Sequence, residues 1–385
     1  MRDAGLSVRE DSVGNIFGRL EGTDESSGAV GSGSHCDAIP AAGMYDGVVG
    51  VVGAIEALRA LREAGFRPER PLEAVMFTSE EPTRFGLSCS GSRAMVGALD
   101  PAYLAGLPDS RRPGEEGATY AAAACAAGYG GCDGDHASLL QGARLADGYY
   151  DSFVELHIEQ GPFLERDGLD IGVVTAIAAP AALEVDFAGD GGHAGAQLMP
   201  WRNDAGLAAA ELALKVEELA LGTGSMDTVA TTGVMSFAPG AVNSVPRGGH
   251  MEVDIRDVDG ERRDGVVAGI KSFAEEVAAR RNVRLSMRTI NQDPPASSGA
   301  RVVEAAAAAA ESLGLTYKRM PSRAYHDTLF MALHCDTAMV FIPCYKGYSH
   351  RPDEFAPTDA IVKGVNTLAL TMAALSSSSS SSSSS

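Results

Sequence analysis

The sequence has few basic residues for its length. Lysine and arginine number 31 against 51 aspartates and glutamates, which gives a formal net charge of −20 at pH 7. Nucleic acid and anionic membrane surfaces would repel such a chain, so neither is expected as a partner. A small anionic substrate is still compatible with this charge, because two metal ions and one arginine can reverse the sign of the charge locally.

The sequence also lacks the patterns of disulfide scaffolds and membrane proteins. Its six cysteines form no Cys-x-x-Cys pair and none of the spacings of a small secreted domain, so we expect free thiols. No apolar run reaches the roughly 18 residues of a membrane helix. No signal peptide is visible after Met1.

The two ends of the chain are unusual. Gly5 is typical of the residue that closes a helix, and a strand through Val8 should follow it, so the pattern predicts that the chain opens on the end of a helix. We therefore expect residues before Met1 in the natural protein, and any targeting signal would lie there. Residues 376–385 are all serine, and this composition predicts a disordered tail.

What is present is enough for more than one hydrophobic core. The chain has 385 residues, of which 45% are hydrophobic. The first half alternates strands and helices, with apolar residues at helical spacing over 48–63 and a strand at 72–78. After about residue 177 the pattern becomes strand-helix-strand-strand-helix-strand, which is typical of a compact α+β unit. The predicted division is a main domain over 1–177 and 294–375, with a second domain over 178–293 inserted into it.

Five separate stretches contain residues that bind hard divalent cations. Two cations side by side need about three protein ligands each, and one carboxylate must bridge them. The five residues that supply this set are His35, Asp46, Glu81, His157 and His350. Each alone is weak evidence, since a histidine in an apolar strand is more often a satisfied core residue. Glu80, adjacent to a ligand, is left over as a general base.

The expected strands would bring these residues to one place. The strand at 72–78 ends just before Glu80, and His157 lies in an apolar strand. Open α/β sheets place their sites at the carboxyl ends of strands. His35 and Asp37 are two residues apart, so on a strand they would face the same side. The Asp37 carboxylate would then fix the tautomer of the His35 imidazole.

Three polar residues in the second half are candidates for substrate contacts or catalysis. His193 lies in a glycine-rich turn, and Asn243 lies in a turn bounded by prolines. His326 is followed by Asp327, which suggests an imidazole polarised by a carboxylate.

Arg256 is a candidate for binding a substrate carboxylate. A guanidinium can bind a carboxylate through two hydrogen bonds. The alternative is a structural salt bridge with Asp254 or Asp257, which lie beside Arg256 in the same expected strand. The residues alone do not decide between these two roles.

These motifs together resemble the amidohydrolase branch of metallopeptidase family M20. The resemblance extends from about Gly5 to Leu370, and its most specific segments are 157–161, 192–204 and 243–246. Segments 78–86, 322–327 and 344–350 are closer still to the members that act on ureidoglycolate. Members that act on allantoate or carbamoyl amino acids tend to have small residues where this chain has Tyr325 and Tyr348.

The resemblance implies a fold, a metal site and an assembly. The expected fold is α/β, with a di-metal aminopeptidase-like catalytic domain and an inserted ferredoxin-like domain that serves as a lid and in dimerisation. One metal would bind His35, Asp46 and His157, and the other would bind Asp46, Glu81 and His350. Mn²⁺ is the expected metal, and Zn²⁺ also suits these ligands. The lid would join a homodimer, in which some lid residues reach the active site of the partner subunit.

The resemblance also implies an activity. The expected reaction is hydrolysis of the ureido C–N bond of (S)-ureidoglycolate to glyoxylate, ammonia and CO₂ in ureide breakdown. Glu80 would be the general base, and His193 or His326 would stabilise the oxyanion. The residues expected to contact the substrate are Gln160, Asn243, Arg256, Tyr325 and Tyr348.

Three alternatives remain at this stage. Allantoate or an N-carbamoyl-L-amino acid could be the substrate, with the same mechanism. The chain could also be a non-catalytic homologue that binds a small molecule. The plant relatives imply a location in the endoplasmic reticulum, with the cytoplasm as the alternative.

Overall fold

The computed structural model describes residues 1–111, 118–130, 132 and 134–377, and the chain forms two compact units. The first unit contains Met1–Ala176, Ser297–Ser322 and His326–Ser385, and the second contains Ile177–Ala296 and Arg323–Tyr325. The expected boundaries near 177 and 294 lie close to these divisions. The short segment Arg323–Tyr325, which the sequence analysis assigned to the main domain, groups with the second unit instead.

The first unit is built on a nine-stranded sheet. Its strands, in spatial order, are β1 (Ser7–Glu10), β2 (Ile16–Leu20), β4 (Leu72–Phe77), β3 (Ala29–His35), β5 (Tyr150–Ile158), β15 (Asp336–Ile342), β6 (Ile171–Ile177) and β13 (Ala296–Ser297), and β14 (Tyr317–Ser322) pairs with β6. The four strands β4, β3, β5 and β15 are parallel to one another. Their carboxyl ends therefore meet at one edge of the sheet, where an α/β protein places its site.

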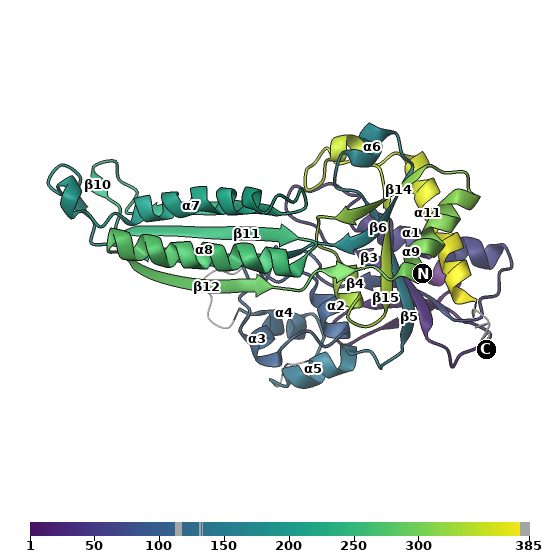
Figure 1. Ribbon diagram of the computed structural model, residues 1–385. Coiled ribbons are helices and arrows are strands. Elements are labelled where there is room, and N and C mark those ends of the chain that lie inside the picture. The colour runs from purple at the N-terminus through teal and green to yellow at the C-terminus, as the bar shows by residue number, and fades with distance from the viewer. Residues whose placement is uncertain (112–117, 131, 133, 378–385) are drawn as a thin grey trace, which may run out of the picture. The chain divides into compact units, whose positions relative to one another are not determined.

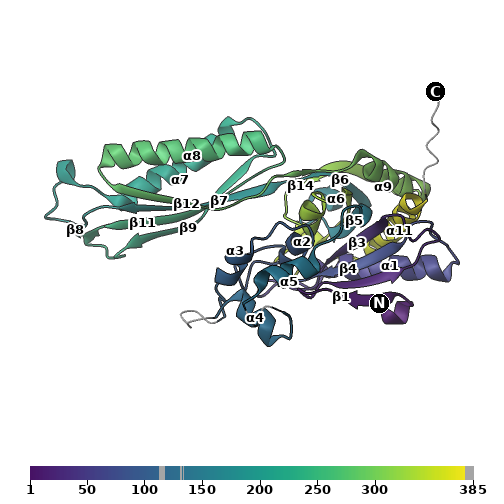
Figure 2. The ribbon, with the colours of Figure 1, turned by 90° about the horizontal axis from the view of Figure 1, so that it is seen from below.

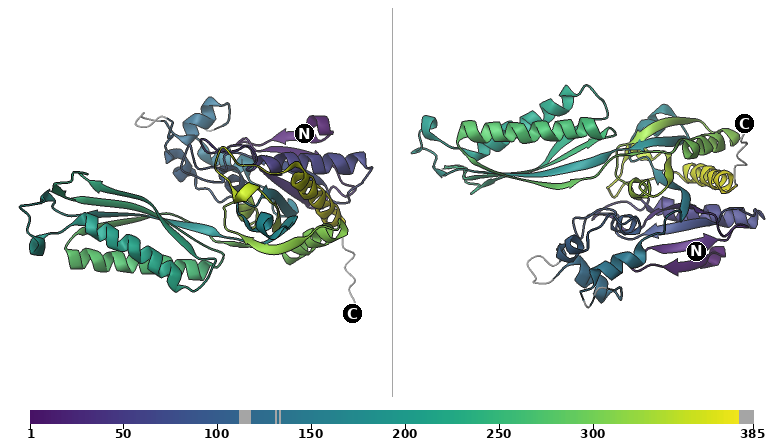
Figure 3. Two further views of the ribbon diagram at one scale, coloured as in Figure 1. Left: turned by 90° about the horizontal axis from the view of Figure 1, so that it is seen from above. Right: turned by 60° about the horizontal axis from the view of Figure 1, so that its bottom comes forward.

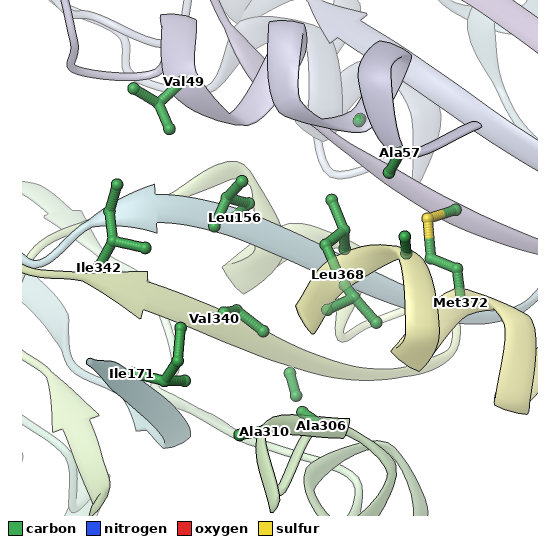
Figure 4. Packing of buried hydrophobic residues seen from close by; sticks show 14 of the residues in the cluster. Val49, Ala57, Leu156, Ile171, Ala306, Ala310, Val340, Ile342, Leu368 and Met372 are labelled. Atoms are coloured by element: carbon green, nitrogen blue, oxygen red, sulfur yellow. The ribbon is translucent and has the colours of Figure 1, made fainter. Parts of the chain in front are cut away.

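Three long helices pack against this sheet: α1 (Val48–Glu63), α9 (Ala300–Ser312) and α11 (Thr358–Ser376). Their apolar faces form one buried cluster with Leu156 of β5 and Val340 of β15. Figure 4 shows side chains of the three helices gathered around these two strands. The helix predicted at 48–63 has the predicted bounds, because its apolar residues recur at helical spacing and Gly65 follows its end with a positive φ.

Shorter helices complete the first unit: α2 (Ser90–Met95), α3 (Pro101–Gly106), α4 (Tyr120–Ala126), α5 (His136–Ala143), α6 (Phe163–Asp167) and α10 (Asp327–Met331). Cys125 of α4 and Cys132 form a disulfide, so the prediction of free thiols is wrong for this pair. After α4 the chain turns back toward the end of this helix, so the Cα atoms of Cys125 and Cys132 lie 5.1 Å apart. No cysteine spacing motif marks this return in the sequence.

The two termini bear on earlier expectations. Gly5 has a φ of 76° and closes the short 3-10 helix Arg2–Ala4, which is the helix end that the sequence indicated. Ser376 is the last residue of α11 and is buried, so the helix extends one residue into the expected serine tail. Ser377 follows as the C-cap of the helix, and residues 378–385 of that tail lie outside the described residues.

The second unit is an antiparallel sheet with two helices. Its elements along the chain are β7 (Ala179–Ala188), α7 (Ala205–Gly222), β9 (Val229–Ala238), β11 (Gly248–Asp257), α8 (Gly260–Arg281) and β12 (Arg284–Gln292). The strand order β12-β7-β11-β9 is that of a ferredoxin-like unit, as expected. Both helices lie on the same face of the sheet (Figures 1, 2 and 3) and form a core of their own with β7 and β11.

The second unit also contains a short two-stranded ribbon. The two-residue strands β8 (Gly192–His193) and β10 (Ser244–Val245) pair antiparallel in the second unit. None of the helices in the described part of the chain is both long and apolar enough to span a membrane.

Candidate metal centre and active site

Two of the expected ligands lie at the converging ends of parallel strands. His35 is the last residue of β3 and pairs in register with Phe77 of β4. His157 is near the end of β5, opposite Phe341 of β15. Because these strands are parallel, the two imidazoles emerge at the same edge, and their ring centroids are 6.2 Å apart.

The first group of donors consists of His35, Asp46 and His157. The Nε2 atom of His157 is 3.1 Å from Asp46 Oδ1, and the Nε2 atom of His35 is 3.9 Å from the same oxygen. All three side chains are buried. Their donor atoms lie within 4.8 Å of one another, close enough for a single cation to touch all three.

The second group shares Asp46 with the first. His350 Nε2 is 3.0 Å from Asp46 Oδ2 and 3.3 Å from Glu81 Oε1. Asp46 therefore presents one oxygen to each group of donors. A carboxylate that bridges two cations must be arranged in this way.

The tautomers of the histidines in the first group suit metal binding. His35 Nδ1 lies 2.9 Å from the carbonyl oxygen of Asp37, and His157 Nδ1 lies 2.9 Å from that of Ile158. A carbonyl oxygen only accepts hydrogen bonds, so each Nδ1 carries a proton. In the neutral rings, the lone pairs of both Nε2 atoms then point to the donor group.

The electrostatics of the site also fit divalent cations. Burial lowers the pKa of His157, but the hydrogen bond and charge of Asp46 outweigh it and raise the pKa to about 9. Hydrogen bonds to Asp46 and Glu81 raise the pKa of His350 to about 10. Glu81 Oε1 is buried and lies 3.3 Å from His350 Nε2. The carboxylates thus attract positive charge strongly, and a bound cation would displace the imidazole protons.

Glu80 lies beside the first donor group but belongs to neither of the two donor groups. Its Oε2 is 3.7 Å from His35 Nε2, and its Oε1 accepts a hydrogen bond from the buried thiol of Cys89 at 3.3 Å. Burial raises the pKa of Glu80 well above its ordinary value, and the charges of Asp327 and Glu81 raise it further. A carboxyl group with a raised pKa, next to the donors, has the properties of a general base.

The Asp37 carboxylate lies beside the His35 imidazole, with Oδ1 3.7 Å from Nδ1, but its hydrogen bonds go elsewhere. It accepts hydrogen bonds from the backbone N–H groups of Glu80 at 3.1 Å and Glu81 at 3.0 Å. His35 is oriented by the backbone carbonyl of Asp37, because β3 ends at His35 and the strand alternation does not continue to Asp37. The Asp37 carboxylate therefore positions the Glu80–Glu81 segment.

Gln160 and Tyr348 are the expected substrate residues of the first unit. Gln160 Nε2 donates to Asp46 Oδ1 and to Ser349 Oγ, each at 3.1 Å, so its side chain lies at the donor groups. Its Oε1 is buried and has no hydrogen-bond partner among the described residues. Tyr348 lies two residues before His350, and the guanidinium of Arg351 stacks 3.7 Å from the centre of its ring.

His326 is buried behind the first donor group. It is 2% exposed, and its ring packs edge-on against His157 with centroids 4.6 Å apart. Its Nε2 lies 2.9 Å from Ser322 Oγ, and Asp327 accepts a hydrogen bond from Ser92. These contacts place His326 as a support for the His157 ring.

The other candidates lie in the second unit. His193 is exposed on β8 and pairs with Ser244 of β10, which brings Asn243 next to it; the carbonyl of Asn243 accepts a hydrogen bond from Ala194 N at 2.9 Å. Arg256 binds Asp254 through Nε and Nη2 at 2.8 and 3.2 Å, which is the salt bridge that the sequence left open.

Tyr325 belongs to the second unit as well. Its hydroxyl donates to Asp293 Oδ2 at 2.6 Å.

Two residues of the first unit were missed by the sequence analysis. Cys89 binds Glu80, and Glu354 is a buried carboxylate that contacts the segments carrying Asp46 and His350. A single cysteine and a glutamate in a loop carry no sequence signal of such roles. Only the packing of distant segments places them at the site.

Comparisons with known proteins agree with this geometry. The model of peptidase family M20/M25/M40 matches residues 31–374. The chain is 54% identical to the ureidoglycolate hydrolase of Oryza sativa subsp. japonica, over 98% of this chain and 76% of that protein. It is 53% identical to the ureidoglycolate hydrolase of Arabidopsis thaliana, over 97% of this chain and 77% of that protein.

A more distant relative and a solved structure extend the likeness. An N-carbamoyl-L-amino acid amidohydrolase of Geobacillus stearothermophilus is 38% identical, over 97% of this chain and 88% of that protein. The crystal structure of AtUAH in complex with glyoxylate is similar, with a TM-score of 0.86, 52% identity and coverage of 97% of this chain and 88% of the other. The chain therefore belongs to peptidase family M20/M25/M40.

Proposed function

We propose that this protein hydrolyses the ureido C–N bond of (S)-ureidoglycolate, which releases ammonia and CO₂, and that the remaining hydroxyglycine loses a second ammonia to give glyoxylate. The observation that carries the proposal is the pair of donor groups that share Asp46, with Glu80 beside them. Relatives named ureidoglycolate hydrolase, at 53–54% identity over nearly the whole chain, support the choice of substrate.

The donor set and the family support divalent cations as the cofactor. We propose that His35, Asp46 and His157 hold one cation and that Asp46, Glu81 and His350 hold the other. Mn²⁺ is our choice, although imidazole and carboxylate donors also suit Zn²⁺. When bound, the cations would polarise the ureido carbonyl and make a water molecule more acidic.

The residues of the chain would then move the protons and stabilise the charge. Glu80 takes a proton from the attacking water and returns it to the departing nitrogen, for which its raised pKa is suitable. His193 would donate to the oxyanion. The burial of His326 and its contact with Ser322 make it the weaker candidate for that role.

The expected substrate residues differ in the groups that they can offer. The free Oε1 of Gln160 can accept a hydrogen bond from a ureido N–H. Arg256 and Asn243 would bind the carboxylate. Since Asp254 already uses Nε and Nη2 of Arg256, the substrate must share those donors or use Nη1. Tyr325 and Tyr348 would limit the size of the substrate.

A substrate comparison tests the proposal. Ammonia release by the Mn²⁺-loaded protein should be faster with ureidoglycolate than with allantoate or an N-carbamoyl-L-amino acid, by about tenfold or more in kcat/KM. The reason for this expectation is the size of Tyr325 and Tyr348, since members that act on those other compounds tend to have small residues at these positions. Protein treated with a chelator is the control.

Each other outcome of this comparison has a distinct meaning. A preference for allantoate or a carbamoyl amino acid would overturn the substrate and leave the mechanism. No turnover of any of the three by folded, metal-loaded protein would favour the non-catalytic homologue.

We also propose a homodimer formed through the second unit. On α7, Leu207, Leu214 and Leu221 are spaced seven residues apart, so they share one helix face, and all three are exposed. At the edge of the sheet, β9 exposes Val234 and Phe237. An apolar helix face and an exposed strand edge on the same unit suit pairing with a second copy.

The dimer is tested by charging the helix face. The double substitution Leu214→Glu and Leu221→Glu should turn a dimer into a monomer in sedimentation equilibrium, because these side chains are 69% and 75% exposed and can be charged without disturbing a core. Leu333→Glu, at an exposed leucine of the first unit, should leave the dimer intact. A double variant that sediments like the wild-type dimer would contradict this interface.

The compartment is a separate proposal. We propose the endoplasmic reticulum rather than the cytoplasm, as the family resemblance implies. The Cys125–Cys132 disulfide supports an oxidising compartment, since the cytosol keeps most thiols reduced. A fluorescent fusion of the complete gene product that co-localises with a reticulum marker is the expected result, and a diffuse cytoplasmic signal would contradict it.

A further inference from the structure

Glu354 is a buried carboxylate that joins two distant segments of the site. It is 4% exposed. Its Oε1 accepts hydrogen bonds from the backbone N–H groups of Tyr45 and Asp46, both at 3.0 Å. Its Oε2 accepts from Ser349 Oγ at 2.9 Å and from His350 N at 3.3 Å. One oxygen thus holds the segment of the bridging aspartate, and the other holds the segment of His350.

These contacts continue into the donor groups. Ser349 Oγ donates to Glu354 and accepts from Gln160 Nε2, which also donates to Asp46 Oδ1. The hydrogen bonds therefore form a closed ring that runs from Glu354 through Ser349 and Gln160 to Asp46 and back. The carboxylate has two lone pairs on each oxygen, and the four donors occupy all of these sites.

Two backbone features show that the packing around Glu354 restricts which residues and conformations fit there. A Cβ atom at Gly43 would lie 2.3 Å from Glu354 Cβ, so the segment before Asp46 packs directly on the glutamate only because residue 43 is glycine. His350 has a φ of 58°, a left-handed conformation that non-glycine residues adopt at a cost. The hydrogen bond from His350 N to Glu354 helps to hold this conformation.

We propose that Glu354 is a positioning residue that sets the spacing between Asp46 and His350 and thereby the affinity of the second cation. The inference rests on the proposed metal site. Asp46 and His350 both lie outside helices and strands, so regular secondary structure does not fix their separation. Glu354 is 308 residues from Asp46 in sequence, yet it accepts from both ligand segments at once. The first group, by contrast, takes two of its three donors from strands.

The substitution Glu354→Gln tests this role. The glutamine amide keeps the shape of the carboxylate and one acceptor oxygen. Its NH₂ group cannot accept hydrogen bonds, so either the Asp46 segment or the His350 segment loses the acceptor for its two donors. In calorimetric titration of the metal-free protein with Mn²⁺, one of the two sites should weaken by about 10- to 100-fold, the effect typical of lost support for a metal ligand. Excess Mn²⁺ should restore kcat, and the KM for ureidoglycolate should change by less than about threefold.

A matched carboxylate serves as control. Asp170 accepts hydrogen bonds from the backbone N–H and the hydroxyl of Thr316, at 2.9 and 2.8 Å, on the first unit and apart from the ligand segments. Asp170→Asn should bind two Mn²⁺ ions with wild-type affinities. An equal loss in both variants would mean that any hydrogen-bonded carboxylate of the first unit has this effect, and it would overturn the proposal.

The remaining outcomes separate this inference from the proposed function. Two Mn²⁺ sites of wild-type affinity in Glu354→Gln would overturn it. Wild-type protein that binds two Mn²⁺ ions and fails to hydrolyse ureidoglycolate would overturn the substrate only. If Glu354→Gln does not fold, Ser349→Ala removes one link of the ring and should weaken one site by about tenfold. Unchanged affinity in that variant would also contradict the proposal.

Discussion

Glu80→Gln should bind both cations as tightly as the wild-type protein and lose about 10²- to 10⁴-fold in kcat, the usual contribution of a general base. The reason is geometric: Glu80 lies 3.7 Å from His35 Nε2 and belongs to neither donor group. An amide cannot take the proton of the attacking water. Stopped assays of ammonia release on Mn²⁺-loaded protein, with metal content measured on the same samples, give both quantities.

A second carboxylate-to-amide change controls for the chemistry of the substitution. Asp170→Asn changes a carboxylate of the same unit whose partners are Thr316 and Lys363, outside the donor groups, and its turnover should stay at the wild-type level. Near-wild-type turnover in Glu80→Gln would remove Glu80 from the mechanism. Loss of metal together with turnover would instead make Glu80 a ligand.

Asp46→Ala should lose both cations, whereas His350→Ala should lose one. Asp46 is the only described residue that contributes to both donor groups, with Oδ1 near His157 and Oδ2 near His350. Its removal also takes away the hydrogen bond and charge that raise the pKa of the buried His157 imidazole. Turnover in Asp46→Ala should therefore fall to the background of the assay.

Metal content after gel filtration distinguishes the two variants. We expect about two cations per chain in the wild-type protein, about one in His350→Ala and about none in Asp46→Ala. Mn²⁺ should raise the Tm of the wild-type protein and leave that of Asp46→Ala unchanged, because only a ligand that binds the native state stabilises it. Two cations retained in Asp46→Ala would refute the shared-carboxylate site.

The two units carry different sets of the residues named above. The first unit holds the donor groups, Glu80 and Gln160 on one set of strand ends and loops. The second unit carries His193, Asn243, Arg256 and Tyr325, which are the residues proposed to meet the substrate. A division of this kind lets the substrate residues vary while the metal site stays constant, which suits a family whose members act on different ureido compounds.

Much of the fold could be read from the sequence because it depends on local patterns. The helix at 48–63 follows from the spacing of its apolar residues, and the βαββαβ order of the second unit follows from successive strand and helix periods. The donor residues could be selected by type, since few side chains bind hard cations. Several of them lie in or just after expected strands, which also predicted that they would gather at one edge of the sheet.

The sequence by itself determined which residue types could hold cations and where the main helices and strands lie, because side-chain chemistry and hydrophobic period are local properties. Only the tertiary structure decided the role of the Asp37 carboxylate, the pairing of Arg256 with Asp254, the Cys125–Cys132 disulfide and the position of Glu354. Each of these depends on where a strand ends or on contacts between segments far apart in the chain. No local pattern records such contacts, since they arise only when the sheet brings the segments together.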